Sequence, residues 1–217
     1  MIVFTIVFGR LAKLPSEGVP YPILVFSAML PWQFFASALQ MCSNSLINDR
    51  KLISKVYFPR LIVPMGAVVV SFVDFLISGS ILLGLMAWYN YVPTLRILML
   101  PLFILIAAAA TIGAGLWFSA INVRYRDFQY VVPFFIQFGL YISPVGFSST
   151  VVPEQWRLLY SLNPMVSAID GFRWAILGSS STLYWPGFLL SLGIVGILLA
   201  TGIRYFRHTE RTFADVI

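Results

Sequence analysis

Long runs of apolar residues alternate with short polar stretches along almost the whole chain. A helix needs about 20 apolar residues to cross the hydrocarbon core of a bilayer, and all but the first run reach that length. Because lipid offers the backbone no hydrogen-bond partner, continuous runs indicate helices and not barrel strands. The pattern predicts an all-α, polytopic membrane protein. Its apolar runs cover residues 1–9, 21–45, 61–88, 97–121, 128–147 and 182–203.

The first run, residues 1–9, is too short to cross a membrane alone. As a helix it would rise about 14 Å, against a hydrocarbon core of about 30 Å. It also lacks the basic start and small-residue cleavage site of a signal peptide. We expect it to be the second half of a first span, so that the chain holds five full transmembrane helices plus a truncated one, and a complete chain six.

Residues 154–177, before the last run, mix charged and aromatic residues in pieces too short to span. Two amphipathic pieces, at 154–162 and 164–177, fit interfacial or re-entrant helices. We expect residues 204–217 to be a polar tail. Alanine and glycine cluster at 107–115, which predicts close packing against another helix.

The loop at residues 48–60 reads NDRKLISKVYFPR and is rich in basic residues. Short loops on the cytoplasmic side carry an excess of lysine and arginine. Successive loops lie on alternating sides of the membrane, and counting from this loop gives nine basic residues on its side and five on the other. The nine are Arg50, Lys51, Lys55, Arg60, Arg124, Arg126, Arg204, Arg207 and Arg211; the five are Arg10, Lys13, Arg96, Arg157 and Arg173. The loop and the C-terminus are therefore expected in the cytoplasm and residues 154–177 outside.

Composition narrows the function classes. With 59% hydrophobic and 10% charged residues and a mean hydropathy of +0.89, the chain is too apolar for an ordinary soluble domain. Its net charge of +6 lies in loops between apolar runs, so topology explains it and no nucleic-acid partner is expected. Cys42 has no disulfide partner in the chain, and the single His208 cannot form a histidine cluster for a metal. No GxxxxGK[ST] string occurs, so the chain binds no ATP phosphates by a P-loop.

Four strings occur in order: VFGRLAKLPSEGVPYPILVFSAMLPWQFF, SLINDRKLISKVYFPRLIVP, INVRYRDFQYVVPF and SLNPMVSAIDGFRWAILG. Together they resemble the permease subunit of ABC-2 type exporters, particularly the polysaccharide and O-antigen branch, over nearly the whole chain. The resemblance implies a homodimer of permeases in the bacterial inner membrane, each docked to a separate ATP-binding subunit. Such a complex exports a lipid-linked glycan, such as O-antigen, capsule or a teichoic-acid-like polymer, between the two permeases. It also implies that the chain is no enzyme and has no cofactor, since ATP and magnesium are bound by the partner.

Residues 48–58 correspond by position to the family's coupling helix, which fits a cleft of the ATPase. Read without the resemblance, the same loop is also explained as a basic segment that only sets topology. The residues assigned to coupling are Asn48, Asp49, Arg50, Lys51, Leu52, Ile53, Lys55, Val56, Tyr57 and Phe58.

The candidate substrate pathway consists of aromatic residues and one acid. Aromatic walls suit the apolar C–H faces of sugars, although such residues also face lipid or form interfacial belts. Asp74 lies about fourteen residues into its span, where a charge needs a partner or water; it either lines the pathway or contacts Ser71 or Ser78, one turn away. The pathway candidates are Trp32, Phe34, Phe35, Asp74, Trp117 and Tyr141, with Phe118, Phe134, Phe135 and Phe138 as further aromatic residues.

Two smaller sets have open interpretations. Trp156, Tyr160, Phe172 and Trp174 form either a gate over the outer exit or simple interfacial anchors. Arg124, Arg126 and Asp127 either carry charge that sets topology or form a site for a substrate pyrophosphate.

For the whole chain, the alternative functions are an ABC-2 exporter of a small molecule, a membrane assembly subunit without transport, and a secondary transporter. The last predicts paired ionisable residues at mid-membrane, where Asp74 stands alone.

Overall fold

A computed structural model describes residues 19–50, 59–178 and 183–210, which form helices, turns and linkers and contain no strand. The all-α prediction is confirmed. In chain order the elements are α2 (Tyr21–Asn48), α4 (Ile62–Trp88), η2 (Leu95–Met99), α5 (Leu100–Arg124), η3 (Arg126–Tyr130), α6 (Val131–Ile142), η4 (Ser149–Val151), α7 (Glu154–Tyr160), α8 (Pro164–Leu177) and α9 (Trp185–Glu210).

Within these ranges, four helices are long and apolar enough to cross a membrane: Tyr21–Asn48, Ile62–Trp88, Leu95–Arg124 and Trp185–Glu210. They match four of the predicted spans. Residues 1–9, the predicted half-span, lie outside the described residues. The predicted span at 128–147 is not among these four helices, and the count of five full spans stays a prediction.

The difference comes from the run at 128–147, which does not form one long helix. Its α-helical part, α6, has 12 residues and is preceded by the 3₁₀ turn η3. The helix ends at Ser143, whose extended backbone (φ −83°, ψ 151°) is the conformation that a following proline, Pro144, imposes. Pro133 is tolerated because it lies in the first turn of α6, where backbone N–H groups need no helical partner.

Helix α9 continues through the first part of the predicted polar tail, as far as Glu210. Neither glycine nor proline follows Gly202 in this stretch, so nothing stops the helix at the membrane boundary. The Thr209 hydroxyl donates to the carbonyl of Tyr205 one turn back (2.9 Å). The predicted tail is thus helical up to Glu210.

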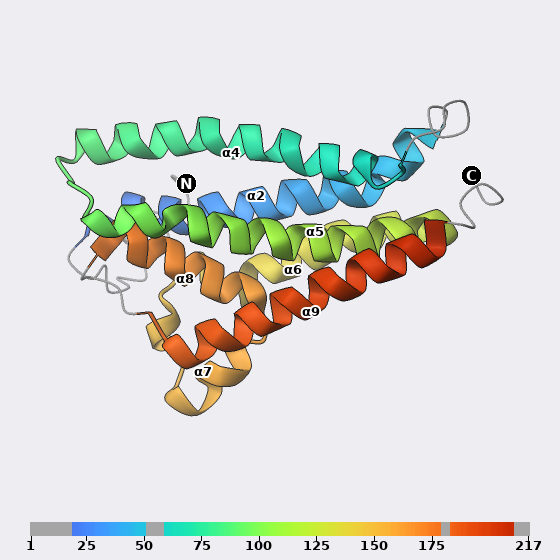
Figure 1. Ribbon diagram of the computed structural model, residues 1–217. Coiled ribbons are helices and arrows are strands. Elements are labelled where there is room, and N and C mark those ends of the chain that lie inside the picture. Colours follow the sequence, from blue (N-terminus) through green and yellow to red (C-terminus); the bar gives the residue numbers. More distant parts are fainter. Residues whose placement is uncertain (1–18, 51–58, 179–182, 211–217) are drawn as a thin grey trace.

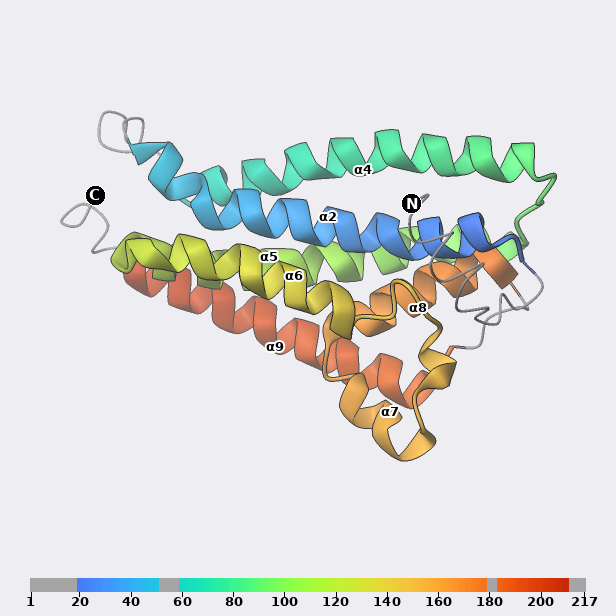
Figure 2. The same ribbon diagram turned by 180° about the vertical axis from the view of Figure 1, so that it is seen from behind.

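The long helices lie roughly side by side, with α2 and α5 at the centre (Figure 1). Helix α4 packs along α2, α9 packs along α5, and α6 lies against the far side of the bundle (Figure 2). The ends of α2, α5 and α9 and the start of α4 share one end of the bundle, while α7 and η2 lie toward the other (Figure 1). We refer to the first as the loop end; the charge pattern predicts it to be cytoplasmic.

Helices α5 and α9 approach closely at two glycines. A Cβ atom on Gly113 would lie 2.8 Å from the Leu198 carbonyl carbon, and one on Gly202 would meet the Gly113 carbonyl oxygen. The absence of side chains is what lets the two backbones touch. The predicted close packing of the small residues at 107–115 is confirmed.

Candidate functional site

A line of polar side chains follows the one face of α2 that its neighbours leave open. Gln33 is exposed, and Ser37 and Gln40 are half-buried. Their spacing of i, i+4 and i+7 places them on one face of the helix. The rest of α2 is mostly buried, since 67% of its membrane window lies inside the chain. The central helix therefore presents amide and hydroxyl groups where a membrane helix normally presents hydrocarbon.

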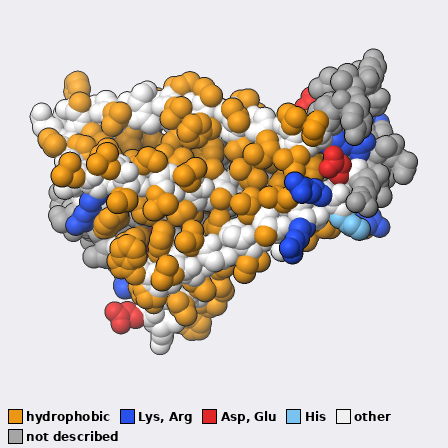
Figure 3. All heavy atoms as spheres, viewed as in Figure 1, with side chains coloured by type: hydrophobic (Ala, Val, Ile, Leu, Met, Phe, Trp, Pro, Cys, Tyr) orange, Lys and Arg blue, Asp and Glu red, His pale blue; other side chains and the backbone are white. Residues whose placement is uncertain are grey.

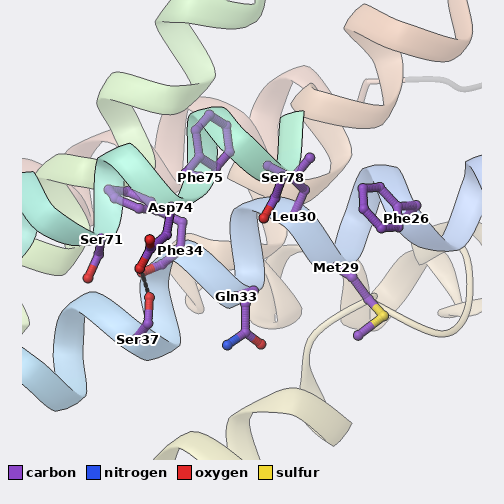
Figure 4. Close-up of a pocket in the computed structure, with 10 residues that line it drawn as sticks. All are labelled: Phe26, Met29, Leu30, Gln33, Phe34, Ser37, Ser71, Asp74, Phe75 and Ser78. Carbon is purple, nitrogen blue, oxygen red and sulfur yellow. Dashed lines mark hydrogen bonds between the residues drawn. The ribbon is translucent and has the colours of Figure 1, made fainter. Parts of the chain in front are cut away.

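Asp74 of α4 faces this line across a pocket of about 260 Å³ between α2 and α4. Figure 4 shows Gln33 and Ser37 of α2 on one side of it and Asp74 on the other. The Ser71 hydroxyl donates to Met41 Sδ (3.5 Å) and not to Asp74. Among the described residues, no ion pair with Asp74 is present, and the side chain is exposed. The carboxylate is thus available to a ligand or to water.

Aromatic rings form the floor of the same pocket. Phe34 is buried, and its ring meets those of Phe72 (6.2 Å between centroids) and Phe75 (5.6 Å) edge to face. Phe26 closes the pocket beside them. The site combines hydrogen-bonding groups with ring surfaces.

A second pocket of about 390 Å³ lies on the other side of the polar line, between α2 and α6. It is lined by Gln40 and by Gln137 of α6, and it shares Gln33 and Ser37 with the first pocket. The two pockets therefore form one groove that crosses α2 from α4 to α6. We call it the polar groove; its polar residues are Gln33, Ser37, Gln40, Ser71, Asp74, Ser78 and Gln137.

A larger and almost entirely apolar pocket, of about 720 Å³, adjoins the second pocket at Trp32, which lines both. Helices α2, α5, α6 and α9 bound it, and residues 162–164 close one end. We call it the aromatic groove; its rings are Trp32, Phe35, Trp117, Phe118, Phe134, Phe135 and Phe138.

The few polar groups beside the aromatic groove are already bonded. The Asn163 amide donates to the Ser143 hydroxyl (3.0 Å), and its oxygen accepts from the Met165 backbone N–H (3.0 Å). The indole N–H of Trp117 donates to the Thr201 hydroxyl (3.2 Å). Little hydrogen-bonding capacity is left there for sugar hydroxyls.

The pathway predicted from the sequence is therefore divided. Trp32, Phe35 and Trp117 line the aromatic groove, whereas Phe34 and Asp74 line the polar groove. Tyr141 lines neither and is 71% exposed. The polar line on α2 was missed, although its spacing is visible in the sequence.

The outer segment, residues 154–177, is held in place by a buried arginine, Arg173. The sequence analysis used this residue only to count basic charges. Arg173 of α8 is 4% exposed and donates to the carbonyls of Leu24 (3.4 Å), Val145 (3.0 Å) and Phe147 (2.7 Å). These bonds join α8 to the start of α2 and to the linker after α6. The Tyr21 hydroxyl donates to the same linker at Gly146 (3.1 Å).

The four predicted gate residues lie in different surroundings. Phe172 is buried against Phe75 (6.0 Å between centroids), Trp174 packs edge to face on Phe103, and Trp156 is exposed. The Tyr160 hydroxyl donates to the Ile142 carbonyl (2.7 Å). Burial and, secondarily, the Asp170 carboxylate raise the pKa of Tyr160, while Arg173 opposes the shift. A gating role for the four remains a prediction.

At the loop end, α2 finishes at Asn48 and is capped by Asp49, with Arg50 following; all three residues are exposed. The other seven coupling residues, between Lys51 and Phe58, lie outside the described residues, as does the side chain of Arg126. The polar groups that flank the loop are tied to other helices, which the sequence did not suggest.

Two sets of bonds make these ties. The buried Asn122 of α5 donates from Nδ2 to the Ser43 carbonyl and to Asn44 Oδ1 (both 3.0 Å). Arg60 donates from its backbone N–H to Glu210 Oε1 (3.4 Å) and from Nη1 to the Glu210 carbonyl (2.5 Å). The residues just before the loop are thus bonded to α5, and Arg60, its last residue, is bonded to the end of α9.

Comparison with known proteins identifies the family. The family model described as "ABC-2 type transporter" matches residues 1–177. The chain belongs to the ABC-2 type transporter family. Within this ABC-2 chain the match covers α2 to α8, and so includes both grooves except for the contribution of α9.

Three curated relatives carry the name O-antigen export system permease protein RfbA. Two from Klebsiella pneumoniae are 26% and 27% identical to this ABC-2 chain, covering 100% and 94% of it and 84% and 82% of the relatives. One from Myxococcus xanthus is 29% identical over 80% of this chain and 66% of the relative. Membership and the four apolar helices make the chain a multi-pass membrane transport subunit, and the ABC-2 family implies an ATP-binding partner.

Proposed function

We propose that this ABC-2 chain is the permease subunit of an ATP-driven exporter of O-antigen or a related lipid-linked glycan across the bacterial inner membrane. The observation that carries the proposal is the polar groove, where three polar residues of the central helix lie beside an acid within the apolar helices. Polar and ionisable side chains are costly against lipid and occur in spans where they meet water, substrate or another helix. The names of the relatives support an O-antigen as the cargo.

The groove offers the chemistry that a glycan needs. Amides and hydroxyls supply both donors and acceptors, and the Asp74 carboxylate accepts from sugar hydroxyls. Phe26, Phe34 and Phe75 add ring surfaces for C–H faces. These groups are not specific for a particular sugar, so the groove suits a polymer whose successive units pass the same positions.

The groove is open on one side in a single copy of the chain. A second copy facing it would enclose the pathway and shield its polar residues from lipid, and we therefore propose a homodimer. Its C-termini and coupling segments would face the cytoplasm, where each copy binds one ATP-binding subunit. ATP and magnesium would be held by that subunit, and the permease would need no cofactor of its own.

Asn122 and the Arg60–Glu210 contact give the proposed coupling a physical route. When the partner moves residues 48–58, the bonds of Asn122 to α2 and of Arg60 to α9 move the central and last helices with the loop. Since α2 carries the polar groove, its displacement changes the width of the pathway.

The test measures glycan export by cells that lack their own permease and receive this chain with its ATP-binding subunit. We expect a complex whose ATPase activity depends on the permease. The variant Ser78→Leu removes a groove hydroxyl and narrows the path, while Ser80→Leu makes the same change on α4 outside both grooves. Loss of a hydrogen bond predicts an export rate roughly 2- to 10-fold lower for Ser78→Leu, and no change for Ser80→Leu. Equal export by both variants, or efflux of a small molecule without glycan export, would refute the proposal.

A further inference from the structure

Asp74 gives the polar groove a negative charge that no other described lining residue balances. The three helices that bound the groove, α2, α4 and α6, contain no lysine, arginine or histidine, and Asp74 is their one acid. On the face of the molecule shown in Figure 3, charged side chains lie toward the two ends of the bundle and at α7, and the middle is apolar. In the described part of the chain, the charge of the groove is therefore set by Asp74.

The carboxylate lies in the middle of the polar face of α4. Ser71 precedes it by three residues and Ser78 follows it by four, so the three side chains share one side of the helix. Figure 4 shows Asp74 facing Ser37 of α2 across the pocket, with Gln33 one turn away on the same helix as Ser37. A ligand in this pocket is surrounded by hydroxyls, an amide, rings and one carboxylate. An anionic ligand would meet the acid and, among the described residues, no cation.

The size of the pocket determines how strongly the acid acts on a ligand. A sphere of the pocket's volume, about 260 Å³, is about 8 Å across, so a charged group inside it lies within about that distance of the carboxylate. At an effective dielectric constant of about 20 to 40, the interaction of two unit charges about 8 Å apart changes an equilibrium constant roughly 6- to 30-fold. A negative group is disfavoured by this factor and a positive group is favoured by it, whereas a neutral sugar unit is not affected.

We propose that Asp74 selects the exported glycan by charge: polymers of neutral or amino sugars pass the polar groove, and polymers with an anionic group in every unit are excluded. The inference rests on the proposed function, since it concerns the same groove. Successive units pass the same position, so each anionic unit meets the repulsion again, whereas a charge carried once at the end of a polymer meets it once. The second copy in the proposed homodimer adds a second Asp74, and cation-selective pores exclude anions by such rings of acids.

The first experiment measures the charge of the groove without transport, on the permease in complex with a cysteine-free ATP-binding subunit in lipid nanodiscs. In the variant Ser78→Cys, the introduced thiol lies one turn from Asp74 and lines the same pocket. Its reaction rates with a cationic and with an anionic methanethiosulfonate reagent of similar size are followed by the intact mass of the permease. Cys42 is the one cysteine of the parent chain and is buried, so the parent provides the background rate.

The measured quantity is the ratio of the cationic to the anionic rate. Adding Asp74→Asn, which keeps the size of an exposed side chain and removes its charge, should lower this ratio at least about sixfold. Adding Asp74→Glu should keep the ratio high, and Glu154→Gln, which removes an exposed acid from α7, should leave it unchanged. An equal ratio with Asp74 and with Asp74→Asn would overturn the inference, because the carboxylate would then be neutralised by another part of the complex. A thiol that reacts with neither reagent would also overturn it, because the groove would then be closed to water.

The second experiment measures export from proteoliposomes of two synthetic lipid-linked oligosaccharides, supplied together, with the same lipid, length and linkage. One is built of glucose and the other of glucuronic acid, so they differ only in the carboxylate of each unit. We expect the glucose polymer to be exported at least about sixfold faster, and Asp74→Asn to reduce that preference by a similar factor while Asp74→Glu retains it. Equal export of both polymers by the parent would refute the charge selection and leave the glycan pathway standing. Export of neither polymer, with the thiol result intact, would refute the glycan pathway and leave the exclusion of anions from the groove supported.

Discussion

The contact between α5 and α9 depends on two glycines, and adding one methyl group there tests the packing directly. In Gly202→Ala the new Cβ would meet the carbonyl oxygen of Gly113, a backbone atom that cannot rotate away. In Gly113→Ala it would lie 2.8 Å from the Leu198 carbonyl carbon, about 0.6 Å inside ordinary van der Waals contact. The helices must separate by about that much. Gly196, on the same helix as Gly202, has nothing within 4 Å of an added Cβ and provides the matched control.

The magnitude follows from these distances. Overpacking of a rigid contact costs about 1–3 kcal/mol, and separation also weakens the neighbouring Trp117–Thr201 bond and the Trp117–Tyr205 stack. Alanine is a better helix former than glycine by about 0.5–1 kcal/mol, a gain that the control obtains in full. Both variants gain this helix propensity, so Gly202→Ala should be less stable than Gly196→Ala by the overpacking cost alone, roughly 1–3 kcal/mol.

The assay is thermal unfolding of the purified chain in one detergent, followed by the loss of the monodisperse peak in size-exclusion chromatography. We expect a lower midpoint for Gly202→Ala and Gly113→Ala than for the parent chain, and an equal or higher midpoint for Gly196→Ala. If all three alanine variants unfold at the same temperature, the backbones of α5 and α9 do not touch at Gly113 and Gly202.

Other substitutions test the ties that hold the outer segment and the loop. Arg173→Met should destabilise the chain by about 3–5 kcal/mol, because three carbonyls, two of them in buried hydrogen bonds, lose a charged donor. Arg157→Met, on the exposed α7, should cost under about 1 kcal/mol, and thermal unfolding of the two variants compares them. Asn122→Ala should reduce the amount of glycan exported per ATP hydrolysed, because it removes the bond between α5 and α2. Ser119→Ala removes a buried hydroxyl that has no partner among the described residues, and it should leave this ratio unchanged. Transport and ATPase assays on the same preparation measure the ratio for both variants. Folding raises the pKa of Tyr160 above its ordinary value of 10. The folded state therefore favours the protonated phenol, and this contribution to stability is complete below pH 10. It is lost as the pH rises through the higher pKa of the folded state. Tyr160→Phe should remove that alkaline dependence in unfolding midpoints measured from pH 9 upward.

Most of the helical architecture could be predicted from hydropathy, because a bilayer leaves the backbone few alternatives. Four spans and the two short outer helices are where the apolar runs and amphipathic pieces indicate them. The break after α6 was less visible, although Pro144 marks it. A count of apolar residues treats proline as hydrophobic, whereas its effect on the preceding residue, Ser143, ends the helix.

The site was harder to predict because side chains on one apolar run face different neighbours. The aromatic residues were grouped by type, yet Phe34 and Phe35 are consecutive and line different grooves. Gln33, Ser37 and Gln40 carried a usable signal, since a polar line at helical spacing is rare in a span. Nothing in the sequence indicates that Arg173 reaches three carbonyls on two other segments, because those bonds depend on the tertiary fold.

Helix α2 lines both the polar groove and the aromatic groove and so connects them mechanically. Gln33 and Phe35 are two residues apart, which places them about 200° apart around the helix axis, one in each groove. Trp32 stands at the border of both, directly after Pro31, whose missing N–H leaves the helix one backbone hydrogen bond short at that level. A rotation of α2 driven from its loop end therefore cannot widen the polar groove without moving Phe35 and Trp32 within the aromatic groove. If the polar groove is the proposed pathway, a change in its width is therefore accompanied by repacking of the aromatic groove.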